Sequence, residues 1–153
     1  MPTAAPVRSR PLSFEDRPAW ERIWRANLAH FRAGDSAAAA IDETWRRLMD
    51  PREPLQGWLL WLEDQAAGLA HVVLRYHTFS TRPVAILEDL WIEPFARRKG
   101  LAEGAIEQLM REGRDLDWRR IEWETDDGNL AAQRLYDRIA EPVAVKRYQI
   151  DLA

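Results

Sequence analysis

The residues best suited to chemistry lie where a basic loop opens into a predicted helix. The loop reads Arg97-Arg98-Lys99-Gly100, and apolar residues then recur at helical spacing through 101–114. The start of a helix has about four backbone N–H groups without intrahelical partners and the positive end of the helix dipole. Gly100 is small enough to let a ligand approach the backbone. The segment therefore predicts an anion site suited to a pyrophosphate.

A second interpretation of this loop is a solvated basic turn between a strand and a helix. The sequence contains neither GxxxxGK followed by Ser or Thr nor GxGxxG, so the loop is not a P-loop or a dinucleotide fingerprint. The loop alone leaves both interpretations open.

Two motifs resemble the GNAT acetyltransferases. The run Arg97-Arg98-Lys99-Gly100-Leu101-Ala102 is similar to the family motif Q/R-x-x-G-x-G/A, which holds the pyrophosphate of acetyl-CoA. Asn129-x6-Tyr136, after a predicted strand at 121–125, resembles the pattern in which Asn contacts the cofactor and Tyr acts at the thiol. Taken singly, Asn129 could be a helix N-cap and Tyr136 a core residue. The resemblance implies acetyl-CoA as acyl donor, and the absence of cysteine and of histidine ligand spacing leads us to expect no metal.

The resemblance also implies a role for each position. The backbone of the central strand would pair with the pantetheine and polarise the thioester carbonyl, and the loop N–H groups would contact the pyrophosphate. Tyr136 would protonate the departing thiolate. The residues expected to contact the cofactor are Leu90, Trp91, Ile92, Arg97, Arg98, Lys99, Gly100, Leu101, Ala102, Glu103, Asn129 and Tyr136.

An acidic pair, Glu88-Asp89, directly precedes the cofactor segment and is expected to bind the acceptor. The surrounding segments resemble most the diamine and polyamine N-acetyltransferase branch, where such a pair assists binding and deprotonation. Deprotonating an alkylamine with a pKa of about 10.4 costs about 4.6 kcal/mol at pH 7. Glu88 could act as the base through water, or it could simply pair with a neighbouring arginine. Strand alternation places Glu88 on the face of Leu90 and Ile92, and Asp89 on the other face unless a bulge intervenes.

Periodicity and turn signals predict an α/β (α+β) fold, which the resemblance identifies as a GNAT fold with a mixed, mostly antiparallel central sheet and helices on both faces. We expect one acetyl-CoA-binding N-acetyltransferase domain over 1–153, with 1–6 disordered. The expected strands are 7–12, 58–62, 67–76, 84–92, 121–125 and 143–152. The expected helices begin at a Ser13-x-x-Asp16 capping box, at Ser36, at Leu101 and after Asn129.

Composition narrows the possible functions. The 153 residues carry a net charge of −3, which argues against a general nucleic-acid surface. No apolar run approaches the ~18 residues of a membrane span, and the N-terminus lacks a signal-peptide pattern, so we expect a cytoplasmic protein. The absence of cysteine excludes disulfides and cysteine nucleophiles. The three histidines show no metal-ligand spacing, and His71, within a strand-like run, is predicted to be a packed core residue.

Three functional hypotheses follow. The leading one is an acetyl-CoA-dependent N-acetyltransferase that acts on a small primary amine by direct transfer, and the resemblance suggests a homodimer. The second acetylates a protein N-terminus or lysine. The third is a degenerate domain that senses acyl-CoA, against which the retention of Tyr136 and Glu88 argues.

Overall fold

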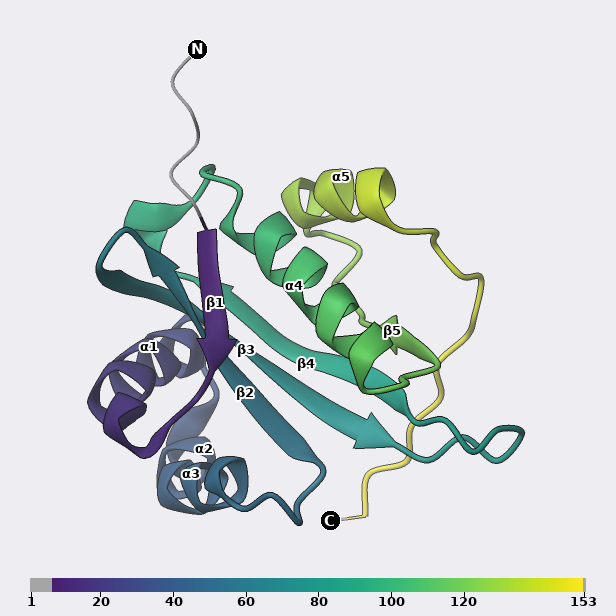
Figure 1. The fold of residues 1–153 in the computed structure, drawn as a ribbon, viewed down its shortest axis with the longest axis horizontal. Coiled ribbons are helices and arrows are strands. Elements are labelled where there is room, and N and C mark those ends of the chain that lie inside the picture. The colour runs from purple at the N-terminus through teal and green to yellow at the C-terminus, as the bar shows by residue number, and fades with distance from the viewer. Residues whose placement is uncertain (1–6, 153) are drawn as a thin grey trace.

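Five strands form one sheet in the order β1-β2-β3-β4-β5 in the computed structural model, which describes residues 7–152 (Figure 1). The first four strands pair antiparallel, and β5 joins β4 in parallel. This confirms the predicted mixed, mostly antiparallel sheet. The prediction for residues 1–6 lies outside the described residues. The strands are β1 Val7–Pro11, β2 Leu55–Leu62, β3 Gln65–Arg75, β4 Val84–Ile92 and β5 Arg120–Glu122.

Helices cover both faces of this sheet. Helices α1 and α3 pack on one face, α4 packs on the other, and α5 lies beside α4 (Figure 1). The capping box at Ser13 and Asp16 is present, whereas Ser36 lies inside a helix and caps none. The helices are α1 Arg17–His30, α2 Gly34–Ala39, α3 Ile41–Met49, α4 Leu101–Asp115 and α5 Leu130–Ile139, with short 3-10 turns η1 Phe14–Asp16 and η2 Pro94–Ala96.

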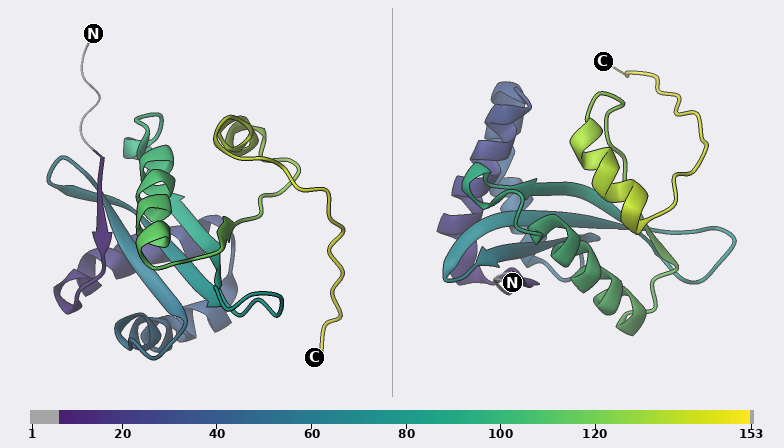
Figure 2. Two further views of the ribbon diagram at one scale, coloured as in Figure 1. Left: turned by 45° about the vertical axis from the view of Figure 1, so that its right-hand side comes forward. Right: turned by 90° about the horizontal axis from the view of Figure 1, so that it is seen from above.

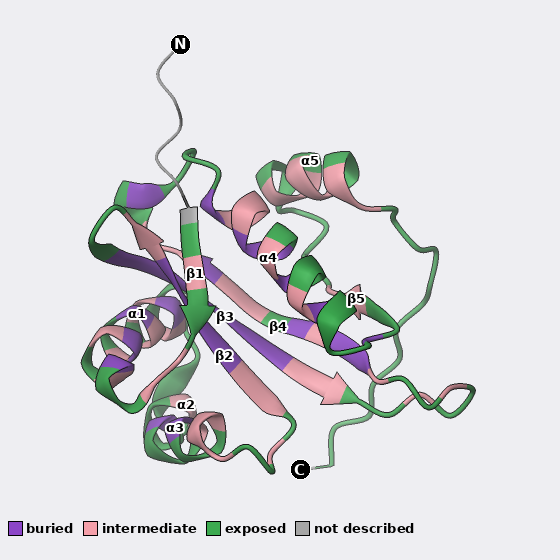
Figure 3. Cartoon of the chain, in the orientation of Figure 1, coloured by how far each residue is buried: buried purple, intermediate pink, exposed green. Residues whose placement is uncertain are grey.

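The core consists of two apolar clusters, one on each face of the sheet. The α4 cluster contains Leu101, Ile106 and Leu109 of α4, and the α1 cluster contains Trp20 and Ile23 of α1. Side chains along a strand alternate between faces, so Leu60 packs in the α4 cluster while its neighbour Leu59 packs in the α1 cluster. The continuous apolar run in β2 is therefore a strand that is buried on both sides, which Figure 3 shows along the middle of β2 and β3. Burial on both faces holds the central strands β2 and β3 in fixed positions.

A β-bulge in β4 changes which way the acidic pair faces. Opposite β3, Leu87 pairs with Val72 and Asp89 pairs with His71, so Glu88 is an extra residue. Leu87 and Leu90 both contact the α4 cluster. Both acidic residues lie between these two and off the α4 face. The prediction that Glu88 shares a face with Leu90 is therefore wrong, because the bulge shifts the alternation by one residue.

The predicted final strand at 143–152 does not form. Within residues 7–152, the segment after α5 has no secondary structure and its N–H groups reach no backbone acceptor. Its apolar side chains stay exposed, and Figure 2 shows it running beside the molecule without joining the sheet. The segment has an alternating pattern, but no strand within residues 7–152 pairs with it.

Candidate active site

The centre of the site is an open edge on β4. Strand β5 pairs with Val84, Ala85 and Ile86. Among residues 7–152, the next six residues of β4, Leu87–Ile92, have no neighbouring strand on that side. Unpaired backbone N–H and C=O groups along such an edge can pair with an extended ligand as with another strand. The residues predicted to contact the pantetheine, Leu90 to Ile92, lie on this free edge.

The loop beyond β4 presents a row of unpaired backbone donors. Within residues 7–152, the N–H groups of residues 98–103 donate to no protein acceptor. Arg98 and Gly100 have positive φ angles of 59° and 81°, which is costly for the arginine. Alternating backbone conformations of this kind aim successive N–H groups into one concavity that suits an anion. A Cβ built on Gly100 would meet no protein atom within 4 Å, so the backbone there is open to a ligand.

The three cations of the loop have different surroundings. Arg97 folds back onto β4: its Nε donates to the carbonyl oxygen of Ile92 at 3.0 Å and its guanidinium lies 4.9 Å from the Trp91 ring centroid. Arg98 and Lys99 form no ion pair within the described part of the chain. Arg97 therefore braces the loop, and two cations remain available to an anion. The face of the Trp91 ring that Arg97 covers is therefore not open to a substrate ammonium.

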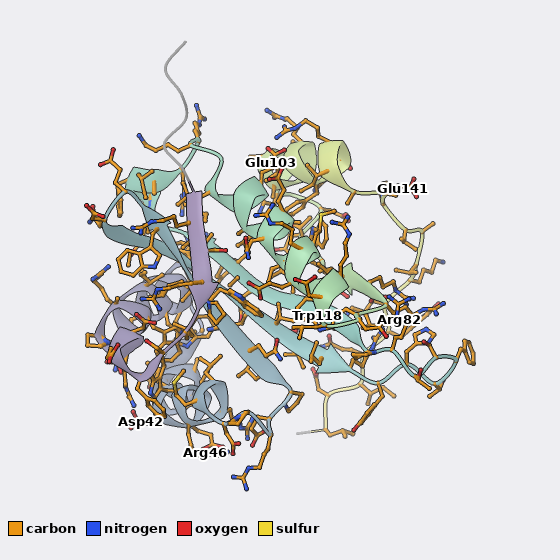
Figure 4. All side chains as sticks on the ribbon, viewed as in Figure 1. Asp42, Arg46, Arg82, Glu103, Trp118 and Glu141 are labelled. Atoms are coloured by element: carbon orange, nitrogen blue, oxygen red, sulfur yellow. The ribbon has the colours of Figure 1, made fainter. Side chains whose placement is uncertain are left out.

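Glu103 lies in the first turn of α4, where its negative charge would repel an anionic ligand at the start of the helix. Its carboxylate accepts a hydrogen bond from Arg138 of α5 at 2.6 Å. Figure 4 shows Glu103 between the two helices. The ion pair offsets the charge of the carboxylate and ties α5 to the beginning of α4.

Tyr136 and Asn129 come from α5 and the turn before it. Tyr136 packs edge-on against Trp123 at 5.4 Å between ring centroids and contacts the α4 cluster, which Leu90 and Ile92 also contact. Burial raises the pKa of the Tyr136 phenol above its ordinary value. Within residues 7–152 no protein group hydrogen-bonds its hydroxyl. Asn129 Oδ1 accepts from the N–H of Ala132 at 3.3 Å, which confirms the N-cap interpretation; its contact with the cofactor stays a prediction.

The acidic pair lies on the opposite side of the sheet from Tyr136. Glu88 is exposed and has no arginine partner among residues 7–152, so the ion-pair alternative finds no support in this part of the chain. Asp89 is 28% exposed and accepts a hydrogen bond from the buried His71. The core position predicted for His71 is confirmed, but its bond to Asp89 was missed. Only the antiparallel register of β3 and β4 reveals that bond.

The comparisons with known proteins agree with this geometry. The model of the acetyltransferase (GNAT) family matches residues 18–140. This chain belongs to the GNAT acetyltransferase family. It is therefore an acyltransferase enzyme.

Two relatives and one solved structure show the range of the similarity. The D-amino-acid N-acetyltransferase HPA3 of Saccharomyces cerevisiae is 27% identical over 82% of this chain and 79% of its own length. The thialysine N-epsilon-acetyltransferase of Caenorhabditis elegans is 32% identical over 73% of this chain and 69% of its own length. A solved aminoglycoside N-acetyltransferase in complex with CoA is 19% identical and covers 100% of this chain and 99% of its own, with a TM-score of 0.78. This last likeness shows the fold.

The described residues contain neither a cluster of metal ligands nor a membrane-spanning helix. Within 7–152, no three His, Cys, Asp or Glu side chains gather closely enough to hold a metal ion. In the same range, no helix is long and apolar enough to span a membrane.

Proposed function

We propose that this enzyme transfers the acetyl group of acetyl-CoA directly to the primary amine of a small cationic acceptor, such as a diamine or polyamine. The observation that carries the proposal is the free edge of β4, which leads to a loop whose N–H groups at residues 98–103 have no acceptor in the described part of the chain. Acetyl-CoA supplies an activated acetyl group as a thioester. The residues present fit this molecule, since an extended edge and an anion-binding loop lie in sequence along one path.

The chain's own groups have separate tasks in this proposal. The N–H groups of the loop and the side chains of Arg98 and Lys99 bind the pyrophosphate. The backbone of Leu90 to Ile92 binds the pantetheine and polarises the thioester carbonyl. Tyr136 then donates its phenolic proton to the departing thiolate, for which its raised pKa keeps the proton available at neutral pH. Glu88 accepts the proton of the acceptor amine through water.

The acidic pair supports a cationic acceptor. The bulge places Glu88 and Asp89 off the face that Tyr136 contacts, so donor and acceptor would approach the free edge of β4 from opposite faces of the sheet. The two named relatives are a D-amino-acid and a thialysine N-acetyltransferase, which supports a small amine as the acceptor. The narrower choice of a diamine rests on the motif resemblance alone. A peptide amine is the alternative. A cytoplasmic location stays a prediction from the sequence.

Acceptor charge provides the first test. We expect diamines and polyamines to react with a higher kcat/KM than monoamines that have neutral or acidic tails. The reason is that the carboxylates of Glu88 and Asp89 would attract the second positive charge of a diamine. Asp89→Asn should lower kcat/KM for diamines roughly tenfold, about 1.4 kcal/mol, and leave the value for neutral-tailed amines nearly unchanged. Release of CoA can be followed with a thiol-reactive dye, since the protein has no cysteine of its own.

The control for this test is Asp115→Asn, at the end of α4. That variant changes the net charge equally and should keep the diamine preference. If Glu88→Gln and Asp89→Asn both leave diamine turnover intact, the acidic pair does not bind the acceptor, and the peptide alternative gains ground.

We also propose that two copies form a dimer through the segment after α5. Its apolar side chains, Val143, Val145, Tyr148, Ile150 and Leu152, are 76–94% exposed. Within residues 7–152 its backbone is unpaired, while β5 ends the sheet with a free edge. Tyr148, Ile150 and Leu152 alternate with polar residues, so an extended backbone places these three side chains on one face. Such a segment fits the sheet edge of a second copy, where its backbone would be paired and these side chains would be buried.

Light scattering after size exclusion tests the dimer. We expect a dimer at micromolar concentration and a monomer when Tyr148 and Ile150 are both changed to Lys, because these two side chains share one face of an extended segment and two charges cannot be buried in an apolar contact. Gln149→Lys adds charge to the same segment at a polar position and should keep the dimer. A wild-type monomer at all concentrations would show the proposal to be wrong.

A further inference from the structure

The buried His71 of β3 connects α1 with the acidic pair. It is 1% exposed, and both of its ring nitrogens have partners. Trp20 Nε1 of α1 donates to His71 Nε2 at 3.0 Å, and His71 Nδ1 lies 2.9 Å from Asp89 Oδ2. The three side chains therefore form one chain of hydrogen bonds from the core to the surface of the site.

Trp20 fixes the direction of these hydrogen bonds. An indole N–H can only donate, so His71 Nε2 must accept, and the ring proton must be on Nδ1. That proton points at Asp89. An imidazolium would place a second N–H against the Trp20 N–H, so the hydrogen bond from Trp20 keeps the ring neutral. Trp24 packs edge-on against the imidazole, at 4.7 Å between ring centroids, and encloses it further.

Among residues 7–152, no arginine or lysine pairs with Asp89. Its partner is a neutral donor, whereas Asp16 and Glu103, for example, each pair with an arginine. Within residues 7–152, Asp89 Oδ1 accepts no hydrogen bond. The Asp89 side chain is 28% exposed, so its second oxygen can meet a cation or water from outside the protein.

We propose that His71 is a positioning residue: the bond from Trp20 fixes its tautomer, and His71 in turn holds Asp89 so that Oδ1 faces the ammonium group of the acceptor. The assignment rests on the proposed function, since it requires a cationic acceptor at the acidic pair. It adds to that function a residue that sets acceptor specificity without contacting the substrate.

Kinetics of paired substitutions provide one test. His71→Leu removes both hydrogen bonds, and we expect KM for a diamine to rise roughly tenfold, about 1.4 kcal/mol, with kcat and the Kd of acetyl-CoA little changed. His71→Gln can accept from Trp20 and donate to Asp89, so it should restore most of the lost affinity. In Asp89→Asn the free charge is already gone, and adding His71→Leu should change KM by less than about twofold.

Nuclear magnetic resonance of the imidazole nitrogens gives a second test that needs no substrate. The protein has three histidines, so His30→Gln and His77→Gln assign the signals. We expect His71 in the Nδ1–H tautomer, with a shift of its Nδ1 resonance in Asp89→Asn.

The outcomes separate the two proposals. A protonated Nε2, additive losses in the double variant, or a loss in His71→Leu that is equal for all amines would overturn the positioning role. A wild type without any preference for cationic amines would overturn the acceptor class itself, and this result is obtained before any variant is made. If His71→Leu does not fold, His71→Gln, Asp89→Asn and the spectrum still decide the question.

Discussion

Tyr136→Phe should lower kcat by roughly 10²–10⁴-fold, the usual range for the loss of a general acid, while the affinity for acetyl-CoA barely changes. The phenylalanine keeps the ring that packs against Trp123 and loses only the hydroxyl. In this account the hydroxyl acts on the thiolate, which exists only as the reaction proceeds, so its removal raises the barrier without weakening binding. Steady-state release of CoA at saturating acetyl-CoA measures the effect.

The pH profile of the same variant separates an acid from a base. Burial raises the pKa of Tyr136, so its protonated form is present throughout neutral and mildly alkaline pH and is lost only above its ordinary value of about 10. The defect in Tyr136→Phe should therefore persist at pH 9, whereas a defect in deprotonating the amine shrinks as pH rises. Tyr76→Phe, at a fully exposed phenol, is the matched control. Turnover of Tyr136→Phe close to wild type would mean that water protonates the thiolate.

Gly100→Val should raise the Kd of acetyl-CoA at least tenfold, about 1.4 kcal/mol, because its side chain would fill the space in front of the loop N–H groups. The φ angle of 81° also strains any β-branched residue at this position. A built Cβ meets no protein atom within 4 Å, so the change does not disturb packing. Titration calorimetry of the folded variant measures the Kd.

Gly34→Val is a matched control for backbone strain. Gly34 has the same φ angle of 81° and an equally open Cβ position, but it begins α2, outside the proposed cofactor site. Both variants should lose similar stability, and only Gly100→Val should lose affinity for acetyl-CoA. An equal loss of affinity in both variants would trace the effect to strain, and unchanged binding in Gly100→Val would exclude the loop as the pyrophosphate site.

The elements near the cofactor were predictable because each has a local cause. Pro94 ends the central strand, Gly100 permits the loop conformation before α4, and Asn129 caps α5. The alternation of Leu59 and Leu60 between the two clusters likewise follows from strand geometry. For these segments the sequence within about ten residues decides the structure.

The parts that were not predictable depend on contacts between distant segments. The bulge at Glu88 exists only in the pairing of β4 with β3, so single-strand alternation gave the wrong face for that residue. The Trp20–His71–Asp89 chain joins three elements, and no spacing in the sequence indicates it. The segment 143–152 has the pattern of a strand, but a strand also needs a neighbour, and none of the strands between residues 7 and 152 pairs with it.

The central claim is that the loop and the free edge of β4 together bind acetyl-CoA, and amide hydrogen exchange with and without acetyl-CoA tests it most directly. We expect the unpaired N–H groups at 98–103 and the backbone at 90–92 to become protected together when acetyl-CoA is added. The surface around Arg8 and Arg10, whose guanidinium groups already pair with Asp64 and Asp16, should be unaffected. Binding of acetyl-CoA without protection at 98–103, or with protection around Arg8 and Arg10 instead, would contradict the account.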